Sequence, residues 1–333
     1  MISAFWRDLC SEALLVMNPS SAIQPAPAAV IDGAGRTERR SWLLSEGAEI
    51  APGRAVLKPI GGGSLYEVHL VWDERLHSIC VAKLVRPDQV GDRHALRELR
   101  AEAAILDRLA HPVVVRAFDA VLDGEYPHIL LEHLEGPSLR RLIKRGGALP
   151  LQQLLPLALS ISGALHYLAC EEIVHLDCKP DNIIMGVPPR LIDLSIARSV
   201  ERASRVSRPL GTDAYMAPEQ CDPERLAESI GPPSDVWGLG ATLHHALSGS
   251  KPFPRDKGTR DSDDPLVRFP QLAARPEPLP DRVPARLRAL IESTLDPDPA
   301  GRPSAGEVAA TLEPLVAELP SRLTLSRRGA RVW

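Results

Sequence analysis

Three short runs of apolar residues in the first third of the chain have the pattern and composition of β-strands. They cover residues 57–60, 65–72 and 78–85 and are separated by the glycines 61–63 and by the polar stretch 73–76. Glycine and charged residues at these breaks are typical of turns between antiparallel strands. The pattern therefore predicts an antiparallel sheet near the N-terminus.

One helix interrupts this strand-rich part. Between residues 93 and 110 the apolar side chains recur at helical spacing, at Leu96, Leu99, Ala103, Leu106 and Leu109. Pro112 follows the end of this run, as is common after a helix. Two further strand-like runs, 113–119 and 128–133, are expected to extend the sheet.

Beyond Gly136 the apolar period becomes mainly helical. We expect helices over 151–170, 235–247, 286–295 and 305–317. Short strands and loops at 175–185 and 191–197 separate the first two. A strand-rich first part followed by a helix-rich second part predicts an α+β protein with two lobes and a cleft between them.

The domain boundaries follow from composition. Residues 18–35 are rich in Pro, Ala, Ser and Gly and show no period, so we interpret 1–50 as a flexible extension. A strand-rich lobe over 51–134 and a helical lobe over 135–318 are expected next, and 319–333 would form a tail.

Composition narrows the function classes. The 333 residues are 44% hydrophobic and 25% charged, which supports a large core, and the net charge of −4 argues against a nucleic-acid surface. The five cysteines form no C-x-x-C pair, which favours a reduced compartment. We find no signal peptide, and the apolar stretch 149–169 contains polar residues that indicate a buried helix. The expected location is cytoplasmic, without membrane or nucleic-acid partners.

The first candidate site is the glycine-rich segment from Ile60 to Val68. Gly61 and Gly63 would let backbone N–H groups approach phosphate oxygens, because no Cβ intervenes. By itself a glycine-rich hairpin is more often only a turn. Phosphate binding stays one of two interpretations at this point.

Lys83 ends the apolar run 79–83 and needs an anionic partner there. Glu102, near the apolar stripe of the helix predicted over 93–110, is a candidate. The alternatives are a lysine that extends its amine to solvent at a strand edge and an ordinary surface glutamate.

The strongest signal is the segment from His175 to Asn182. Phosphoryl transfer to a hydroxyl needs a carboxylate, a cation near the transferred group and oxygen ligands for Mg²⁺, and Asp177, Lys179 and Asn182 supply these types in one loop. Asp193 follows soon after, at the end of an apolar strand. Mg²⁺ takes one or two protein ligands together with phosphates, which suits Asp193 and Asn182.

The order and spacing of these motifs closely resemble the protein kinase superfamily, particularly bacterial kinases of the eukaryotic-like Ser/Thr type, from about residue 57 to 315. The fold implied is the two-lobed kinase fold, with a small antiparallel β N-lobe carrying one helix and a larger, mainly helical C-lobe. The resemblance assigns ATP binding to Ile60, Gly61, Gly63, Val68, Lys83, Glu102 and the hinge residues Glu132 and Leu134.

The same resemblance implies roles in the second half of the chain. Asp177 and Lys179 would be catalytic, and Asn182 and Asp193 would bind Mg²⁺, with Mn²⁺ as an alternative. It also implies an activation loop over 193–219, which ends in Ala217-Pro218-Glu219. Two structural residues complete the match, Asp235 as an anchor and Arg302 as the partner of Glu219.

The implied activity is transfer of the γ-phosphoryl group of ATP to Ser or Thr hydroxyls of protein substrates, with autophosphorylation. Three positions depart from the family pattern. Tyr66 stands at the third glycine of the loop, and Ser195 replaces the glycine of D-F-G. Leu176 replaces the arginine of H-R-D, which in the family pairs with an activation-loop phosphate. We therefore expect an enzyme that is not controlled through that contact.

Two alternatives remain at this point. A pseudokinase would keep the fold as a nucleotide-binding scaffold, and the altered glycines leave that open. A small-molecule kinase would lack the segment 217–219 and its partner Arg302. A P-loop ATPase is disfavoured because no G-x-x-x-x-G-K-[ST] string occurs.

Overall fold

The computed structural model describes residues 40–226, 230–255, 258–259 and 262–319. Residues 320–333 of the predicted tail and residues 1–39 of the predicted extension lie outside this part of the chain.

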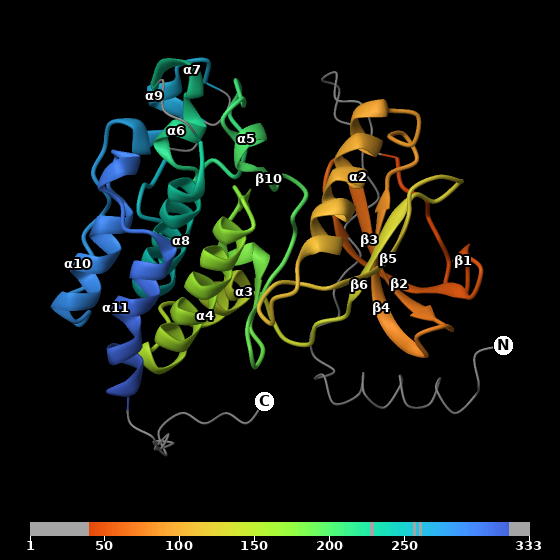
Figure 1. The fold of residues 1–333 in the computed structure, drawn as a ribbon, viewed down its shortest axis with the longest axis horizontal. Helices are drawn as coiled ribbons and strands as arrows, with labels where there is room; N and C mark the ends of the chain where they lie inside the picture. The colour runs from red at the N-terminus through yellow and green to blue at the C-terminus, as the bar shows by residue number, and fades with distance from the viewer. Residues whose placement is uncertain (1–39, 227–229, 256–257, 260–261, 320–333) are drawn as a thin grey trace. The chain divides into compact units, whose positions relative to one another are not determined.

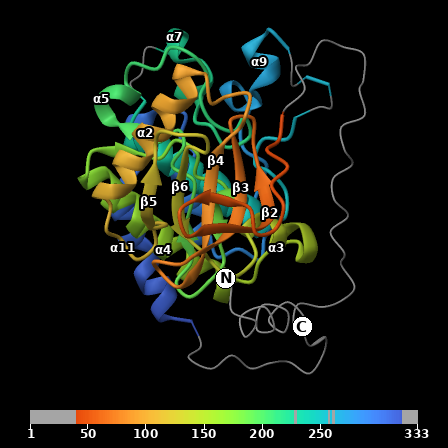
Figure 2. The same ribbon diagram turned by 90° about the vertical axis from the view of Figure 1, so that its right-hand side faces the viewer.

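The strand-rich part is a six-stranded antiparallel sheet in the order β1-β2-β3-β4-β6-β5. Figure 2 shows β2, β3, β4, β6 and β5 side by side. The strands are β1 (Glu49–Ala51), β2 (Arg54–Gly62), β3 (Tyr66–Asp73), β4 (Ser78–Val85), β5 (Ala117–Val121) and β6 (His128–Glu132). The two-lobed α+β architecture expected from the sequence is confirmed.

The two faces of this sheet carry different chemistry. One face buries Val71, Cys80 and Leu84 in a small apolar cluster. Since side chains alternate along a strand, Lys83 lies on the opposite face, where it is paired across the strands with Val68. Alternation thus places one charged side chain among apolar neighbours.

The helix α2 (Arg93–Arg108) starts at Asp92, whose carboxylate accepts the N–H of His94 at 2.8 Å. It buries Leu99, Glu102 and Leu106. These contacts bring α2 against β4, β5 and β6. A glutamate on the buried face of a helix is unusual and indicates that Glu102 has a charged partner.

The chain packs against the sheet before residue 51. The Trp42 indole N–H donates to the carbonyl of Val85 at 2.8 Å, and its ring lies 4.7 Å from that of Tyr126. Residues 40–50, which we expected to belong to the extension, therefore include part of this lobe. The aromatic–aromatic contact explains why: Trp42 buries apolar area that a free leader would expose.

The helical part is built around α4 (Leu151–Cys170), which packs against α8 (Pro232–Ser248) and α11 (Ala305–Ala317). Figure 1 shows these helices together with α3 (Leu139–Gly146) and α10 (Ala285–Thr294). Shorter elements are β7 (Ile173–Val174), β8 (Ile183–Ile184), β9 (Arg190–Leu191), β10 (Arg198–Ser199), α5 (Val200–Ala203), α6 (Pro218–Cys221), α7 (Pro223–Leu226) and α9 (Pro265–Arg268). Single 3₁₀ turns lie at Pro180–Asn182, Pro270–Leu272 and Pro299–Gly301.

By length and composition α4 could cross a membrane. Leu154, Ile161 and Leu168 on this helix are fully buried within the protein. Its apolar surface is thus used in contacts with α8 and α11, as expected for a core helix.

One predicted strand differs from the structure, and one helix was not predicted. The strand expected over 113–119 begins only at Ala117, because Val114 instead forms a single bridge with Leu191. The helix α3 was not predicted, because its eight residues are fewer than the roughly 10 to 12 expected of a helix, although Leu139, Leu142 and Ile143 recur at helical spacing. Ser138 caps α3 by accepting the N–H of Arg141 at 3.3 Å.

Candidate active site

Lys83 is the centre of a buried charge cluster between the sheet and the helical part. Its amine donates to both carboxylate oxygens of Glu102 at 2.8 Å and to Asp193 Oδ1 at 2.7 Å. Lys83 is 7% exposed and Glu102 only 2%. A buried charge is stable only when it is paired, so Lys83 needs an anionic partner. The carboxylates of Glu102 and Asp193 are these partners.

The charges of this cluster shift each other's ionisation. Burial alone would lower the pKa of Lys83, but Glu102 and Asp193 outweigh it and hold that pKa above its usual value. Burial would raise the pKa of Asp193, and the Lys83 cation outweighs this in turn and keeps the pKa well below its usual range. Lys83 is therefore a cation and Asp193 an anion at neutral pH.

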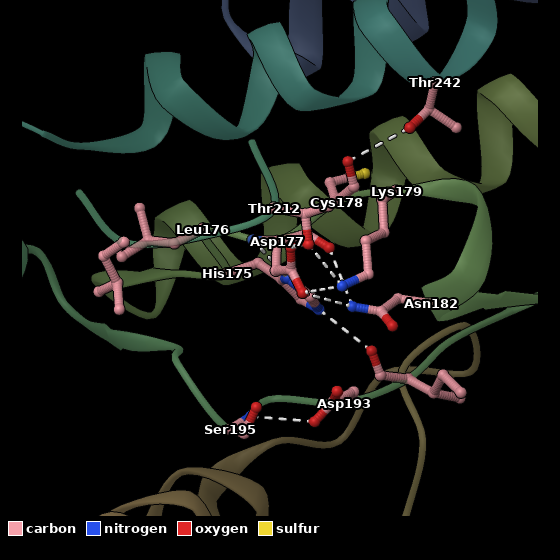
Figure 3. A network of polar contacts seen from close by, with 12 residues as sticks. His175, Leu176, Asp177, Cys178, Lys179, Asn182, Asp193, Ser195, Thr212 and Thr242 are labelled. Atoms are coloured by element: carbon pink, nitrogen blue, oxygen red, sulfur yellow. Dashed lines mark hydrogen bonds and ion pairs between the residues drawn. The ribbon is translucent and has the colours of Figure 1, made fainter. Parts of the chain in front are cut away.

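A second polar cluster lies in the loop after β7 (Figure 3). Asp177 Oδ2 accepts from the Lys179 amine at 2.5 Å and from the Asn182 amide at 3.0 Å. Asp177 Oδ1 accepts from the Thr212 hydroxyl at 2.7 Å, and Lys179 also donates to that hydroxyl at 2.7 Å. The structure thus brings together Asp177, Lys179 and Asn182, the three residue types that the sequence singled out.

A residue of α8 holds the backbone before Asp177 in place. Asp235 accepts the N–H groups of His175 and Leu176, each at 2.7 Å. Leu176 has a positive φ of 65°, which a β-branched or bulky residue avoids unless its surroundings enforce it. Asp235 supplies that constraint, in agreement with its implied role as an anchor.

His175 connects the two clusters. Its Nδ1 accepts the Asp177 N–H at 3.2 Å, and its Nε2–H donates to the carbonyl of Ile192 at 3.3 Å. The Ile192 N–H in turn donates to the carbonyl of Asn182 at 2.8 Å. Asp193, the residue after Ile192, is therefore held next to the loop that carries Asp177.

The glycine-rich segment forms the hairpin between β2 and β3. Gly62 has a φ of 151°, and a Cβ there would lie 2.7 Å from the carbonyl oxygen of Tyr66, so the turn requires glycine at this position. A Cβ at Gly61 or Gly63 would meet nothing within 4 Å. These two glycines leave open space beside the backbone, whereas Gly62 permits the turn.

Arg86 fixes the tip of this hairpin. Its guanidinium donates to the carbonyl of Gly63 at 2.7 Å and to Glu67 Oε1 at 2.9 Å. Neither residue was predicted to contribute to the site, because Arg86 lies outside the motifs and Glu67 is not one of the glycines of its segment. Their pairing follows from the register of β3 and β4, in which Glu67 lies opposite Leu84.

The remaining predicted nucleotide residues lie on strands that border this region or, for Leu134, just after one of them. Ile60 is 48% exposed at the end of β2, and Val68 lies opposite Lys83. Glu132 ends β6, where its carboxylate accepts the Arg116 N–H at 2.8 Å, and Leu134 packs against the main core cluster.

The donor set suits a Mg²⁺ ion that is shared with a nucleotide. Among the described residues, no group of three or more His, Cys, Asp or Glu side chains gathers in a way that could hold a metal alone. Asn182 uses its amide nitrogen toward Asp177, which leaves its amide oxygen for a cation. One carboxylate, one amide oxygen and phosphate oxygens are a typical Mg²⁺ set.

A buried ion pair supports the segment that follows Thr212. The Arg302 guanidinium donates to both oxygens of Glu219, at 2.7 and 2.9 Å. The Ser234 hydroxyl donates to the same carboxylate at 2.7 Å. The pairing implied by the resemblance is therefore present.

A protein kinase domain family matches residues 54–312. The serine/threonine-protein kinase PknB of Mycobacterium leprae is 32% identical over 206 residues, which cover 59% of this chain and 32% of that protein.

Two further relatives carry similar names. The serine/threonine-protein kinase PknA of Mycobacterium tuberculosis is 31% identical over 265 residues, or 75% of this chain and 59% of that protein. The serine/threonine-protein kinase PkaA of Streptomyces coelicolor is 29% identical over 290 residues, or 79% of this chain and 51% of that protein. The match covers less than two thirds of the length of each of these relatives.

Proposed function

This chain belongs to the protein kinase family, and we propose that it transfers the γ-phosphoryl group of ATP to serine and threonine hydroxyls of protein substrates. The observation that carries the proposal is the pair of linked clusters around Lys83 and Asp177. A lysine held between two carboxylates lies next to a loop that presents a carboxylate, an ammonium group and an amide. This is the set of groups that phosphoryl transfer requires.

Lys83 and the glycine-rich hairpin bind the phosphates of ATP in this proposal. Glu102 holds the Lys83 amine in place through two hydrogen bonds of 2.8 Å. The side chains of Ile60 and Val68 would contact the adenine, and the backbone of Glu132 and Leu134 would recognise its polar edge.

Asn182 and Asp193 would hold Mg²⁺, or Mn²⁺ in its place. When bound, the ion neutralises charge that develops on the phosphates. The pKa of Asp193 lies below its usual range, so this ligand stays ionised across the physiological pH range. The Lys83 amine, 2.7 Å from Asp193, keeps the carboxylate in place before the ion binds.

Asp177 orients the incoming hydroxyl and accepts its proton. A carboxylate has about four acceptor positions. Asp177 uses three of them on Lys179, Asn182 and Thr212, which leaves one for the substrate. Lys179 steadies the transferred group, and Thr212 ties the activation loop to this carboxylate.

We also propose that the activation loop is held by apolar contacts instead of a phosphate. Leu176 is 4% exposed and belongs to one buried cluster with Val174, Ala203 and Ile230. Val200, at the start of α5 in the activation loop, packs on the same cluster. The leucine that replaces the family's arginine thus contacts the segment that the arginine would reach through a phosphate.

Transfer of radiolabelled γ-phosphate from ATP with Mg²⁺ or Mn²⁺ tests the activity. Lys83→Met and Asp177→Asn should each reduce transfer to background, since the first removes a phosphate ligand and the second the group that accepts the proton. Lys144→Met is the matched control, because Lys144 is an exposed lysine on α3.

Binding measurements separate the outcomes. A protein that binds MgATP and shows no transfer above the Asp177→Asn background would be a pseudokinase. Equal transfer by the wild type and Asp177→Asn would overturn the catalytic assignment. Circular dichroism of each variant shows whether the fold is retained.

A further inference from the structure

The hydroxyl of Tyr66 is buried and has no hydrogen-bond partner in the part of the chain that the structure describes. Tyr66 as a whole is 7% exposed. A buried hydroxyl without a partner costs about 1–3 kcal/mol. Phenylalanine would fill nearly the same volume without that cost, so packing alone does not explain a tyrosine here.

The position of Tyr66 gives its hydroxyl a specific neighbourhood. It is the first residue of β3, immediately after the glycine-rich hairpin, and its backbone carbonyl accepts the Gly63 N–H at 2.9 Å. Tyr66 pairs with Val85 in the register that pairs Val68 with Lys83. Since alternate residues share a face, Tyr66, Val68 and Lys83 all lie on the face of the sheet that faces α2 and the charge cluster.

The ring of Tyr66 is in direct contact with this cluster. The Lys83 amine lies 4.8 Å from the ring centroid, a distance at which a cation is attracted to the ring. Burial raises the pKa of the Tyr66 hydroxyl, and Glu102 and Asp193 act in the same direction against the effect of Lys83. The hydroxyl therefore remains protonated and can donate a hydrogen bond.

We propose that Tyr66 is a nucleotide-binding residue whose hydroxyl donates a hydrogen bond to a phosphate oxygen of bound ATP beside Lys83. The inference rests on the proposed function, since it requires ATP at this site. A phosphate oxygen is an anionic acceptor, and the cation at this place is Lys83, which also pairs with Glu102 and Asp193. The open backbone beside it belongs to Gly61 and Gly63. The side chain would thus add a fixed donor next to the backbone N–H groups of the hairpin.

Tyr66→Phe tests the proposal by calorimetric titration with MgATP and, in parallel, with adenosine. A hydrogen bond to a charged group contributes about 1.5–3 kcal/mol, so the Kd for MgATP should rise roughly 10-fold to 100-fold. The Kd for adenosine should not change, because adenosine carries no phosphate. Tyr126→Phe is the matched control, since Tyr126 lies in the same lobe on Trp42 and should leave both affinities unchanged.

Urea unfolding of the ligand-free proteins provides a second readout. Loss of an unpaired hydroxyl should leave the midpoint of Tyr66→Phe equal to or above that of the wild type. An unchanged Kd for MgATP would overturn the inference, as would an equal loss of affinity for MgATP and adenosine. A lower midpoint with unchanged affinity would show that the hydroxyl serves the fold.

The wild type separates this inference from the function on which it rests. If the wild type neither binds MgATP nor transfers phosphate, the proposed function fails and the inference fails with it. If the wild type does both and Tyr66→Phe binds MgATP equally well, only the role of Tyr66 is overturned.

Discussion

Arg302 and Glu219 are single residues 83 positions apart that bury opposite charges against each other. Their side chains are 0% and 1% exposed. Removing one partner leaves the other as a buried charge without compensation, and such losses amount to about 3–5 kcal/mol. We therefore expect Arg302→Ala to lower the free energy of unfolding by about that amount in urea titrations.

An exposed pair of the same types is the control. Arg205 and Glu201 lie 2.7 Å apart on the surface, and both side chains are 73% exposed. Arg205→Ala should change stability by less than about 1 kcal/mol, because water already solvates both charges. Equal losses in the two variants would show that burial of the Arg302 pair contributes nothing.

Residue types and spacing were enough to single out Lys83, Asp177, Asn182 and Asp193 as candidates, because the chemistry that each could supply is visible in its side chain. The residues that contact them were harder to predict from the sequence. Thr212 lies 35 positions from the carboxylate that it contacts, and only the folded chain shows that its hydroxyl donates to Asp177. Proximity in space between distant segments is not encoded in local spacing, which is why such contacts were missed.

At the scale of elements, the contact between α8 and α10 depends on a glycine. A Cβ on Gly240 would lie 2.1 Å from Thr294 Oγ1 and 2.9 Å from its Cβ. Overpacking of this kind costs about 1–3 kcal/mol. Gly240→Ala should therefore lower the urea midpoint, although alanine is the better helix former.

Gly163 provides the opposite case within α4. A Cβ there would meet nothing within 4 Å, so Gly163→Ala should raise stability by up to about 1 kcal/mol through helix propensity alone. The two substitutions are chemically identical. A loss of stability in both would contradict the distinction between a close helix contact and open space.

The activation loop gives a second prediction at this scale. Ala203 on α5 is fully buried in the cluster around Leu176, while the next residue, Ser204, is exposed. Ala203→Asp places a charge in that cluster and should strongly reduce phosphate transfer, whereas Ser204→Asp should not.

The phosphorylation state tests the same cluster independently. The fully dephosphorylated and the autophosphorylated enzyme should transfer phosphate at similar rates, because Leu176 cannot bind a phosphate. A large gain in rate that is traced to one phosphate on the activation loop would rule out apolar anchoring.

Long periodic elements were predictable, and short ones were not. The helices α4 and α11 begin and end where their apolar period predicts. The helix α3 has a helical period at Leu139, Leu142 and Ile143, but its eight residues are too short a run to be separated from a loop by sequence alone. The strand β5 starts late because Val114 pairs with Leu191, a contact that the local pattern does not contain.

At the scale of the whole molecule, the buried histidines couple folding to pH. Burial lowers the pKa of His245 from 6.5 to about 4, and Arg140 and Lys251 act in the same direction. His245 is then neutral near pH 7, and its Nδ1 accepts the Tyr215 hydroxyl at 2.7 Å. His128 and His244 are also buried, and burial lowers the pKa of each.

The lowered pKa of these histidines determines how the stability of the fold changes with pH. Between about pH 6.5 and 4 the unfolded chain binds a proton at His245 that the folded chain does not bind, so stability falls as pH falls through this window. Asp193 does not contribute there, because its lowered pKa affects stability only near and below its ordinary value of 3.8. The buried histidines should thus lower the urea midpoint at pH 5 relative to pH 7. Glu102 and Asp235 act in the opposite direction, because burial raises the pKa of each carboxyl.

His245→Gln isolates one of these groups. Glutamine can accept the Tyr215 hydroxyl but does not titrate, so the decrease in midpoint from pH 7 to pH 5 should be smaller in the variant than in the wild type. His128 and His244 remain in the variant, so their contribution to the pH dependence should be unchanged. Comparing the decrease within each protein removes any loss from altered packing, and equal decreases in both proteins would mean that His245 is not protonated on unfolding in this range.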